Sequence, residues 1–388
     1  MTGGAGRPWT LHCAACGGAE PGGGGFRCPA CGGVRRAEPP PGSAVPADSG
    51  APGMWRYRSA LPPVPAPVTM DEGGTPLLDR PALAERFGVA ALAVKDETRN
   101  PTLSFKDRAM SLGVSLAAGV PGLPGVVAAS TGNTAVSAAA YAALAGVPCR
   151  LVCAEAAAGG AKLRIARALG AEVRAVPGDF SAAHRAAAAL EEAGWYTLTT
   201  TFRNPFLAEA HRSVAFEIAA QTLGRPPGWV LVPVGAGPLL WGIHQGFAAL
   251  HAGGLLDAVP RMVAVQAAAC APIVRAFDEG AAEPAPADPG PTSAGAIADP
   301  LRGYTDEGAL TLRAVRASGG AAVAVDDTAI EDAMRVAARA CGLLLEPAAA
   351  APLAAVAALR RSGAMPPGAE VAVLATGHGA KEPDRLAG

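Results

Sequence analysis

The chain has 388 residues, half of them hydrophobic, and a formal net charge of -1 at pH 7. This length suffices for a large core in more than one lobe, and the balanced charge provides no basic field that would attract nucleic acid. Charged residues, prolines or glycines interrupt every apolar run before it reaches the length of a membrane span. The first residues do not join a basic segment to an apolar one, so we expect no secretion signal and a cytoplasmic protein.

Two Cys-x-x-Cys pairs lie in the glycine-rich first part of the chain, residues 1–37. The pair Cys13 and Cys16 is separated from the pair Cys28 and Cys31 by eleven residues, and Gly-Gly follows each pair. Such glycines allow a tight turn that directs two thiolates at one ion, and four thiolates give a tetrahedral structural Zn²⁺ site. The spacing suits a zinc ribbon. Two disulfides are the alternative, which fits a cytoplasmic protein poorly.

A proline-rich arm, residues 38–70, separates this part from a globular part, residues 71–388. In the globular part, short apolar runs that indicate buried strands alternate with alanine-rich stretches that indicate helices. The alternation predicts an α/β fold with mainly parallel sheets that helices cover on both faces. The expected strands are 91–97, 125–130, 148–154, 171–177, 229–234, 262–267 and 370–376, and the expected helices include 135–145, 161–169, 208–223 and 327–341.

A lysine follows the first of these strands, within the segment "NPTLSFKDRAM" at 100–110. Ser104 can cap a helix here, with Asp107 three residues later as in a capping box, and this places Lys106 in the first helical turn. The positive end of the helix dipole and burial both disfavour a charged lysine. A lysine with a lowered pKa is a nucleophile able to form a Schiff base. A solvated lysine is the ordinary alternative.

Three further turns follow expected strands. The segment 130–134, "STGNT", precedes a helix that Gly146 closes, and its hydroxyls, amide and free backbone N–H groups suit a carboxylate or a planar oxygen. The segment 235–238, "GAGP", opens a helix and suits a phosphate, with an ordinary strand-to-helix turn as the alternative. The segment 376–379, "TGHG", ends a late strand. Strand ends converge on one crevice in such sheets, so we expect these turns to share a site.

In combination, these motifs resemble the threonine synthases and their relatives among pyridoxal-phosphate enzymes of the tryptophan synthase β fold, also called fold type II. The likeness runs from about residue 71 to the end of the chain, and some enzymes of this type carry an N-terminal zinc ribbon. It implies two lobes with the cofactor between them, the smaller one spanning about 110–210, a small amino-acid substrate and commonly a homodimer. The motifs that carry it are "NPTLSFKDR", "ASTGNTAVSAAAYAA", "PVGAGPLLWGI", "GLLLEPAAAA" and "ATGHGAKEP".

The resemblance also assigns roles to individual residues. Lys106 would hold pyridoxal 5'-phosphate as a Schiff base and then act as the acid and base for the Cα proton. Asn133 would bind the ring hydroxyl, and Thr376 would face the pyridine nitrogen. The remaining assignments are the substrate carboxylate to Ser130, Thr131, Gly132 and Thr134, and the cofactor phosphate to Gly235, Ala236, Gly237 and Leu239.

Threonine synthases act on O-phosphohomoserine by γ-elimination of phosphate followed by addition of water at Cβ. Thr201, Phe202 and Leu207 stand where such enzymes often hold the substrate phosphate, which needs several charged donors. Arg203 and Arg212 lie nearby and are candidates to bind this phosphate in place of the usual ligands. A close relative with an altered leaving group therefore fits as well. The alternative is an enzyme of β-elimination or β-replacement that acts on serine, threonine or a phosphorylated analogue.

Overall fold

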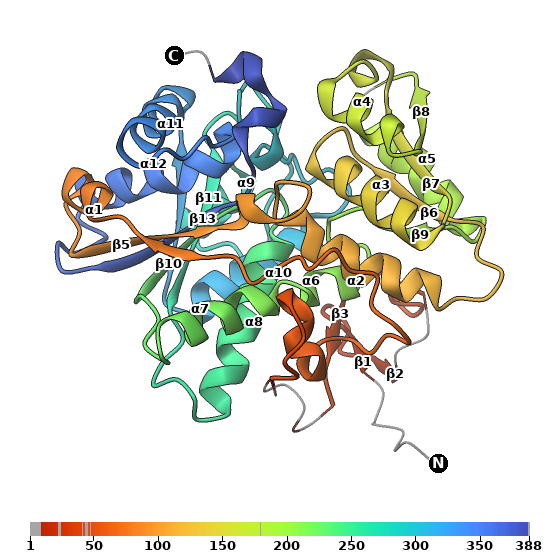
Figure 1. Ribbon diagram of the computed structural model, residues 1–388, viewed down its shortest axis with the longest axis horizontal. Coiled ribbons are helices and arrows are strands. Elements are labelled where there is room, and N and C mark those ends of the chain that lie inside the picture. Colours follow the sequence, from red (N-terminus) through yellow and green to blue (C-terminus); the bar gives the residue numbers. More distant parts are fainter. Residues whose placement is uncertain are drawn as a thin grey trace.

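The computed structural model describes residues 9–21, 25–40, 42, 46, 48–178 and 180–386. The chain forms two lobes and a small N-terminal sheet (Figure 1). The expected α/β class with helix-covered, mainly parallel sheets is confirmed. Among the described residues, no helix combines the length and the apolar character that crossing a membrane requires.

A six-stranded sheet forms the centre of the larger lobe. In sheet order its strands are β12 (Ala321–Val325), β11 (Arg261–Ala267), β10 (Trp229–Pro233), β13 (Glu370–Ala375), β5 (Ala91–Asp96) and β4 (Leu77–Asp79). Neighbouring strands run parallel except for the edge strand β4, which is antiparallel to β5. The helices of this lobe are α1 (Pro81–Phe87), α6 (Pro205–Glu209), α7 (Arg212–Gln221), α8 (Pro238–Ala252), α9 (Pro272–Asp278), α10 (Thr305–Ala317), α11 (Asp327–Cys341) and α12 (Pro347–Arg361).

Successive apolar side chains along these strands point to opposite faces of the sheet, as the pleat requires. Val230 and Val232 pack with α7, α8 and α10 on one face. Leu231 packs with α1, α11 and α12 on the other. The sheet is therefore buried on both sides, which explains why its strands are continuous apolar runs in the sequence.

A four-stranded parallel sheet forms the centre of the smaller lobe, in the order β8 (Glu172–Val176), β7 (Cys149–Ala154), β6 (Val126–Ala129) and β9 (Tyr196–Thr197). One face packs on α2 (Lys106–Ala118), α3 (Asn133–Ala145) and α4 (Ala161–Ala168). The other face packs on α5 (Phe180–Glu192). These strands lie between residues 126 and 197, inside the range of 110–210 that the sequence suggested for this lobe.

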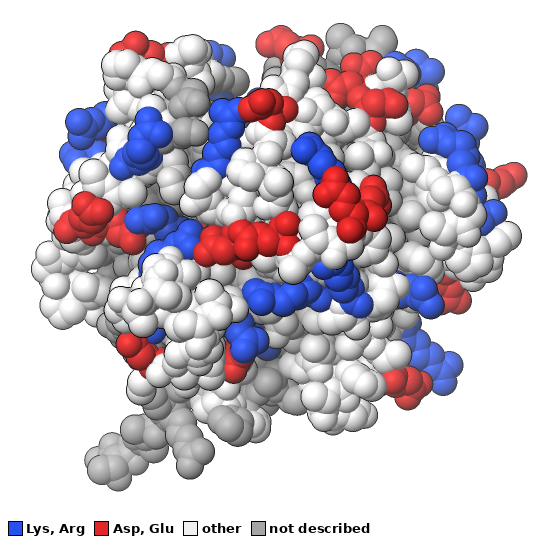
Figure 2. Space-filling model, turned by 180° about the vertical axis from the view of Figure 1, so that it is seen from behind, with Lys and Arg blue, Asp and Glu red and all other residues white. Residues whose placement is uncertain are grey.

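The first part of the chain, which we call the ribbon, forms an antiparallel sheet of β2 (Ala19–Pro21), β1 (Thr10–Cys13) and β3 (Arg35–Glu38). The ribbon lies below α2, α6 and α10 in Figure 1. The arm that follows includes a 3-10 helix, η1 (Gly53–Ala60), with a buried Trp55. On the face shown in Figure 2, acidic and basic side chains are interspersed, in agreement with the small net charge.

The apolar runs of the sequence located every strand that they predicted, but the expected helix 208–223 is wrong in extent. The structure has two helices there, and the first begins earlier. The Asn204 side chain accepts a hydrogen bond from the amide of Phe206 (3.1 Å), and Pro205 occupies the first helical position. An Asn-Pro pair is a favourable helix start, because the proline nitrogen needs no hydrogen-bond partner there.

Candidate active site

Lys106 is the first residue of α2, as the sequence predicted, but the expected cap by Ser104 is wrong. No side chain caps this helix, and the buried Ser104 hydroxyl has no hydrogen-bond partner among the described residues. Asp107 instead accepts hydrogen bonds from the Thr102 amide (2.6 Å) and from the hydroxyls of Thr102 and Ser137 (both 2.5 Å). The carboxylate thus joins the loop before α2 to α3, and this fixes the start of α2.

The amine of Lys106 points toward two threonines of the smaller lobe. Its Nζ donates a hydrogen bond to Thr200 Oγ1 (2.8 Å), which lies 2.8 Å from Thr134 Oγ1. Burial lowers the pKa of Lys106 to about 7. Much of the amine is therefore neutral near pH 7, as a nucleophile requires. Thr200 was missed in the sequence, where the run of three threonines after β9 was the available signal.

The lowered pKa of Lys106 predicts how the cofactor-free protein captures an aldehyde cofactor. Only the neutral amine attacks, so the capture rate should rise as pH increases to about 7 and then level off. A lysine with an ordinary pKa would continue to gain rate up to about pH 10.4. Stopped-flow absorbance of pyridoxal phosphate mixed with the apoenzyme between pH 5.5 and 9 would measure this. A rate that climbs without a plateau would contradict the lowered pKa of Lys106.

Asn133 begins α3 and faces the larger lobe. Its Nδ2 donates to Glu346 Oε2 (2.7 Å), and Glu346 Oε1 lies 2.9 Å from Lys162 Nζ. A Cβ at position 377 would clash with the Glu346 carboxylate, so Gly377 permits this approach. The Asn133 Oδ1 atom is buried and has no hydrogen-bond partner within the described residues. Because buried polar atoms are nearly always paired, this acceptor is available for a bound hydroxyl.

Ser130, Thr131 and Gly132 form the turn that enters α3, as the sequence predicted. The Ser130 hydroxyl accepts a hydrogen bond from the Gly132 amide (3.2 Å). Thr134, in the first helical turn, is the residue whose hydroxyl meets Thr200. First-turn amides of a helix lack intrahelical acceptors and attract anions, so this turn can receive a carboxylate beside Lys106.

Gly235, Ala236 and Gly237 connect β10 to α8. Gly237 has φ of +102°, and a Cβ there would clash with Thr311, whose hydroxyl donates to the Ala236 carbonyl (2.6 Å). Only glycine satisfies both constraints. Leu239 follows in the first turn of α8 with a buried side chain, which leaves its backbone amide as the group to consider. The tight turn and the helix start suit a phosphate.

Thr376 follows β13 at the same sheet edge. β5, β13 and β10 are parallel neighbours, so the segments after them meet at their carboxyl ends. The Phe105 amide donates to the Thr376 carbonyl (3.1 Å), and Ser104 pairs with Gly377. The structure therefore brings the loop that precedes Lys106 into direct contact with the turn 376–379. The buried Thr376 lies one residue from Gly377, which touches the Glu346 and Asn133 pair.

A fully buried ion cluster supports α2 beneath the site. Arg108 donates to Glu97 (2.8 Å) and to Glu217 (2.7 Å), and Lys95 donates to Glu217 (2.7 Å). Burial opposes ionisation of Glu217, but Arg108 and Lys95 together lower its pKa to about 2. The cluster joins β5, α2 and α7, and it lies two residues along the chain from Lys106. The cluster therefore helps to order the loop that precedes Lys106.

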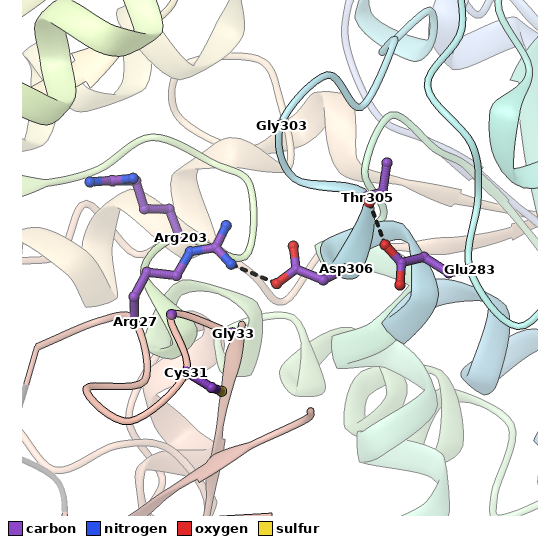
Figure 3. A pocket seen from close by; sticks show the side chains of 9 residues that line it. Arg27, Cys31, Gly33, Arg203, Glu283, Gly303, Thr305 and Asp306 are labelled. Atoms are coloured by element: carbon purple, nitrogen blue, oxygen red, sulfur yellow. Dashed lines mark hydrogen bonds and ion pairs between the residues drawn. The ribbon is translucent and has the colours of Figure 1, made fainter. Parts of the chain in front are cut away.

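The two arginines considered for a substrate phosphate both pair with acidic side chains. Arg212 bonds to Glu209, and its guanidinium lies 5.7 Å from the Trp9 ring centre. Arg203 pairs with Glu191 (2.5 Å). Arg203 also lines a pocket of about 490 Å³ between the ribbon and the larger lobe, beside Arg27 (Figure 3).

The four cysteines of the ribbon come together. The sulfur atoms of Cys13, Cys16, Cys28 and Cys31 lie within 4.8 Å of one another, and all four thiols are free. The sulfur atoms of Cys13 and Cys31 are 3.5 Å apart, and those of Cys16 and Cys28 are 3.7 Å apart. This close set of four donors fits a tetrahedral thiolate site.

The residues assigned to pyridoxal phosphate also have the chemistry that it requires. Asn133 Oδ1 is an unpaired buried acceptor, and Lys106 is a lysine with a lowered pKa. The turn at 235–237 precedes a helix start that suits the phosphate. The three groups come from separate strand-to-helix connections.

Comparison with known proteins identifies the family. A family model described as pyridoxal-phosphate dependent enzyme matches residues 68–377. The threonine synthase of Methanosarcina acetivorans is 37% identical over 339 residues, covering 86% of this chain and 82% of the relative. That of Methanocaldococcus jannaschii is 37% identical over 334 residues, covering 86% and 81%. The resemblance inferred from the motifs is confirmed.

Solved structures show the same fold. A threonine deaminase from T.th. aligns with a TM-score of 0.64 and 28% identity, covering 78% of this chain and 92% of that one. A serine racemase from maize aligns with a TM-score of 0.67 and 21% identity, covering 78% and 88%, which supports the fold alone. The chain therefore belongs to the threonine synthase family of pyridoxal-phosphate-dependent enzymes.

Proposed function

We propose that the protein converts O-phosphohomoserine and water into threonine and phosphate. One observation supports this most strongly: threonine synthases are 37% identical to it over more than four fifths of both chains. Lys106 begins α2 at the edge where the strand-to-helix turns meet, where an enzyme of this family needs its lysine.

We assign each residue a task toward the cofactor. Pyridoxal phosphate, when bound, supplies an electron sink for the charge that develops at Cα. Lys106 would hold the cofactor covalently, and its amine would then accept and return protons at Cα. Asn133 would offer Oδ1 to the ring hydroxyl, and Thr376 would face the ring nitrogen. The turn at Gly235, Ala236, Gly237 and Leu239 would bind the phosphate through backbone N–H groups.

The substrate would bind in the turn before α3. Backbone N–H groups and hydroxyls of Ser130, Thr131, Gly132 and Thr134 would hold its carboxylate, which places Cα close to the Lys106 amine. Thr200 would keep that amine oriented, since it accepts the Lys106 hydrogen bond. For the leaving phosphate, Arg203 would have to exchange its Glu191 partner for the substrate.

The test follows both products from one substrate. Purified enzyme would be mixed with O-phosphohomoserine, and phosphate and threonine would be measured together. Equal amounts of the two support the proposal. Bound cofactor without either product would contradict it, while leaving the family assignment intact.

Two observations favour a second activity, the deamination of threonine or serine. A threonine deaminase shares the fold at 28% identity, and Arg212 is held by Glu209 rather than free for a phosphate. Such a reaction needs no phosphate site. Release of ammonia and a 2-oxo acid from threonine, without turnover of O-phosphohomoserine, would support this alternative.

We further propose that the four ribbon cysteines bind one Zn²⁺ per chain. Four free thiols within 4.8 Å support this, because each thiolate donates one ligand to a tetrahedral ion. Replacing Cys28 with serine should remove the metal and unfold the ribbon, since structural zinc supplies folding free energy. Metal content and limited proteolysis of the first 40 residues would measure this. Cys270→Ser, at a buried cysteine outside the ribbon, is the control that should keep its zinc.

The cellular setting and assembly are proposals as well. We place the enzyme in the cytoplasm, where reduced thiols can bind a metal. By resemblance to related enzymes, we propose that the protein is a homodimer. We also propose that its substrate is a small amino acid. Analytical ultracentrifugation would give the oligomeric state, and a monomeric mass would contradict the dimer.

A further inference from the structure

The segment 198–204, which we call the threonine segment, carries the hydroxyl that accepts the hydrogen bond of the Lys106 amine. It connects β9 to α6 and contains no strand or α-helix of its own. Thr200 is its third residue and accepts the 2.8 Å hydrogen bond from Lys106. The orientation of the Lys106 amine therefore depends on what holds this segment in place.

The ribbon contacts the elements at both ends of the threonine segment. At its start, Phe26 of the ribbon packs edge-on against Tyr196 of β9, with 5.4 Å between the ring centres. At its end, Phe206 of α6 packs against an apolar cluster of the ribbon, made of Trp9, Leu11 and Ala37. The residues on either side of the segment are thus both in contact with the ribbon.

A carboxylate of the larger lobe holds the middle of the segment. The backbone amide of Phe202 donates to Glu307 Oε2 (2.9 Å), and the other oxygen of Glu307 accepts from Arg27 of the ribbon (3.0 Å). Glu307 is buried, at 1% exposure. Burial raises the pKa of Glu307 to about 7, and the Arg27 guanidinium opposes that rise. Arg27 of the ribbon therefore helps to keep the Glu307 carboxylate ionised, and this carboxylate holds the threonine segment.

Two neighbouring carboxylates of α10 hold Arg27. It also pairs with Asp306 (2.7 Å), and the same Asp306 oxygen accepts from the Val34 amide (2.8 Å) on the other side of the ribbon turn. Figure 3 shows the Arg27 guanidinium directed at Asp306, with Arg203 of the threonine segment beside it. Arg27 directly precedes Cys28, one of the four clustered cysteines. The fold of the cysteine cluster and the position of Arg27 are therefore connected.

We propose that the ribbon positions the threonine segment for the reaction, and that the Arg27–Glu307 pair is the main connection. Glu307 and Arg27 are positioning residues: the hydrogen bonds of their side chains go to each other, to Asp306 and to the Phe202 amide, and they act through Thr200 on Lys106. The inference rests on the proposed role of Lys106 as the cofactor lysine. It assigns the ribbon a task in catalysis in addition to metal binding.

The test uses Glu307→Ala in the full chain and measures backbone hydrogen exchange of residues 198–206. Loss of a hydrogen bond to a charged acceptor should raise exchange there about tenfold or more. Capture of pyridoxal phosphate by the apoenzyme should slow several-fold, because the Lys106 amine loses its fixed partner. Zinc content and exchange in residues 9–21 should stay unchanged, which a general loss of ribbon structure would not allow.

Matched variants complete the design. Glu20→Ala removes the carboxylate that pairs with Arg35 (2.6 Å) inside the ribbon. It should change neither the hydrogen exchange of residues 198–206 nor the rate of cofactor capture. Arg27→Ala should reproduce the effect of Glu307→Ala if the latter fails to fold, and Arg27→Lys should restore part of it. Exchange of 198–206 equal to that of Glu20→Ala would overturn the proposal. So would raised exchange with an unchanged capture rate. Neither readout uses a substrate, so failure to turn over O-phosphohomoserine would count against the proposed function only.

Discussion

Replacing Lys106 with alanine should abolish covalent binding of pyridoxal phosphate and lower kcat by about a thousandfold or more. The amine is the nucleophile that the site provides, held 2.8 Å from Thr200 with its pKa lowered to about 7. Absorbance of the dialysed protein would show whether cofactor remains attached. Turnover by the variant would be measured on the same preparation.

Lys106→Arg is the matched control for this prediction. It keeps a positive charge and a long side chain at the same position, but a guanidinium stays protonated and forms no Schiff base. We expect it to lose the covalent cofactor as completely as the alanine variant. Thermal unfolding of the alanine variant should resemble that of the cofactor-free wild type, because among the described residues the Lys106 amine hydrogen-bonds only to Thr200. Retained cofactor absorbance after dialysis of either variant would contradict the assignment of Lys106.

Replacing Arg108 with alanine should reduce the free energy of unfolding by about 3–5 kcal/mol. The substitution leaves Glu97 and Glu217 buried with one cation, Lys95, close to them. An uncompensated buried charge is far more costly than a lost surface pair. Chemical denaturation at pH 7 would measure the change. The control is Arg86→Ala, which removes an exposed pair with Asp332 (3.9 Å) and should cost about 1 kcal/mol or less.

The same variant should change the response to acid. The pKa of Glu217 is lowered in the folded protein, so its contribution to stability is complete above the ordinary value of 4.5 and is lost as pH falls toward about 2. Without Arg108 the pKa of Glu217 should rise, and acid unfolding should begin at a higher pH than in the wild type. Equal acid-unfolding midpoints for the two proteins would contradict a role for Arg108 in holding Glu217 ionised.

The strands and the turns could be predicted from the sequence because each depends on local pattern. Val230, Leu231 and Val232 form a continuous apolar run because both faces of their sheet are covered. β12 was not predicted, since its five residues are only alanine and valine, and such a run is equally compatible with the alanine-rich helices around it.

The contacts between distant segments could not be predicted in this way. The carboxylate of Glu346 bonds to Asn133, which is 213 residues away along the chain. The same holds for Glu307, whose partners Phe202 and Arg27 are 105 and 280 residues distant. No periodicity in the sequence reports pairs of this kind. Ser104 shows the converse: the local capping pattern was present, but the loop geometry set by Leu103, with φ of +62°, directs the chain toward Gly377 instead.

Asn133, Lys162 and Glu346 meet between the lobes through polar atoms. Pulling the lobes apart at this point exposes hydrogen-bonding groups that water can satisfy, and each such exchange costs only about 0.5–1.5 kcal/mol. Separation at these three residues would therefore exchange protein partners for solvent, whereas Leu207 of α6 and the buried Arg108 cluster would still join the two lobes.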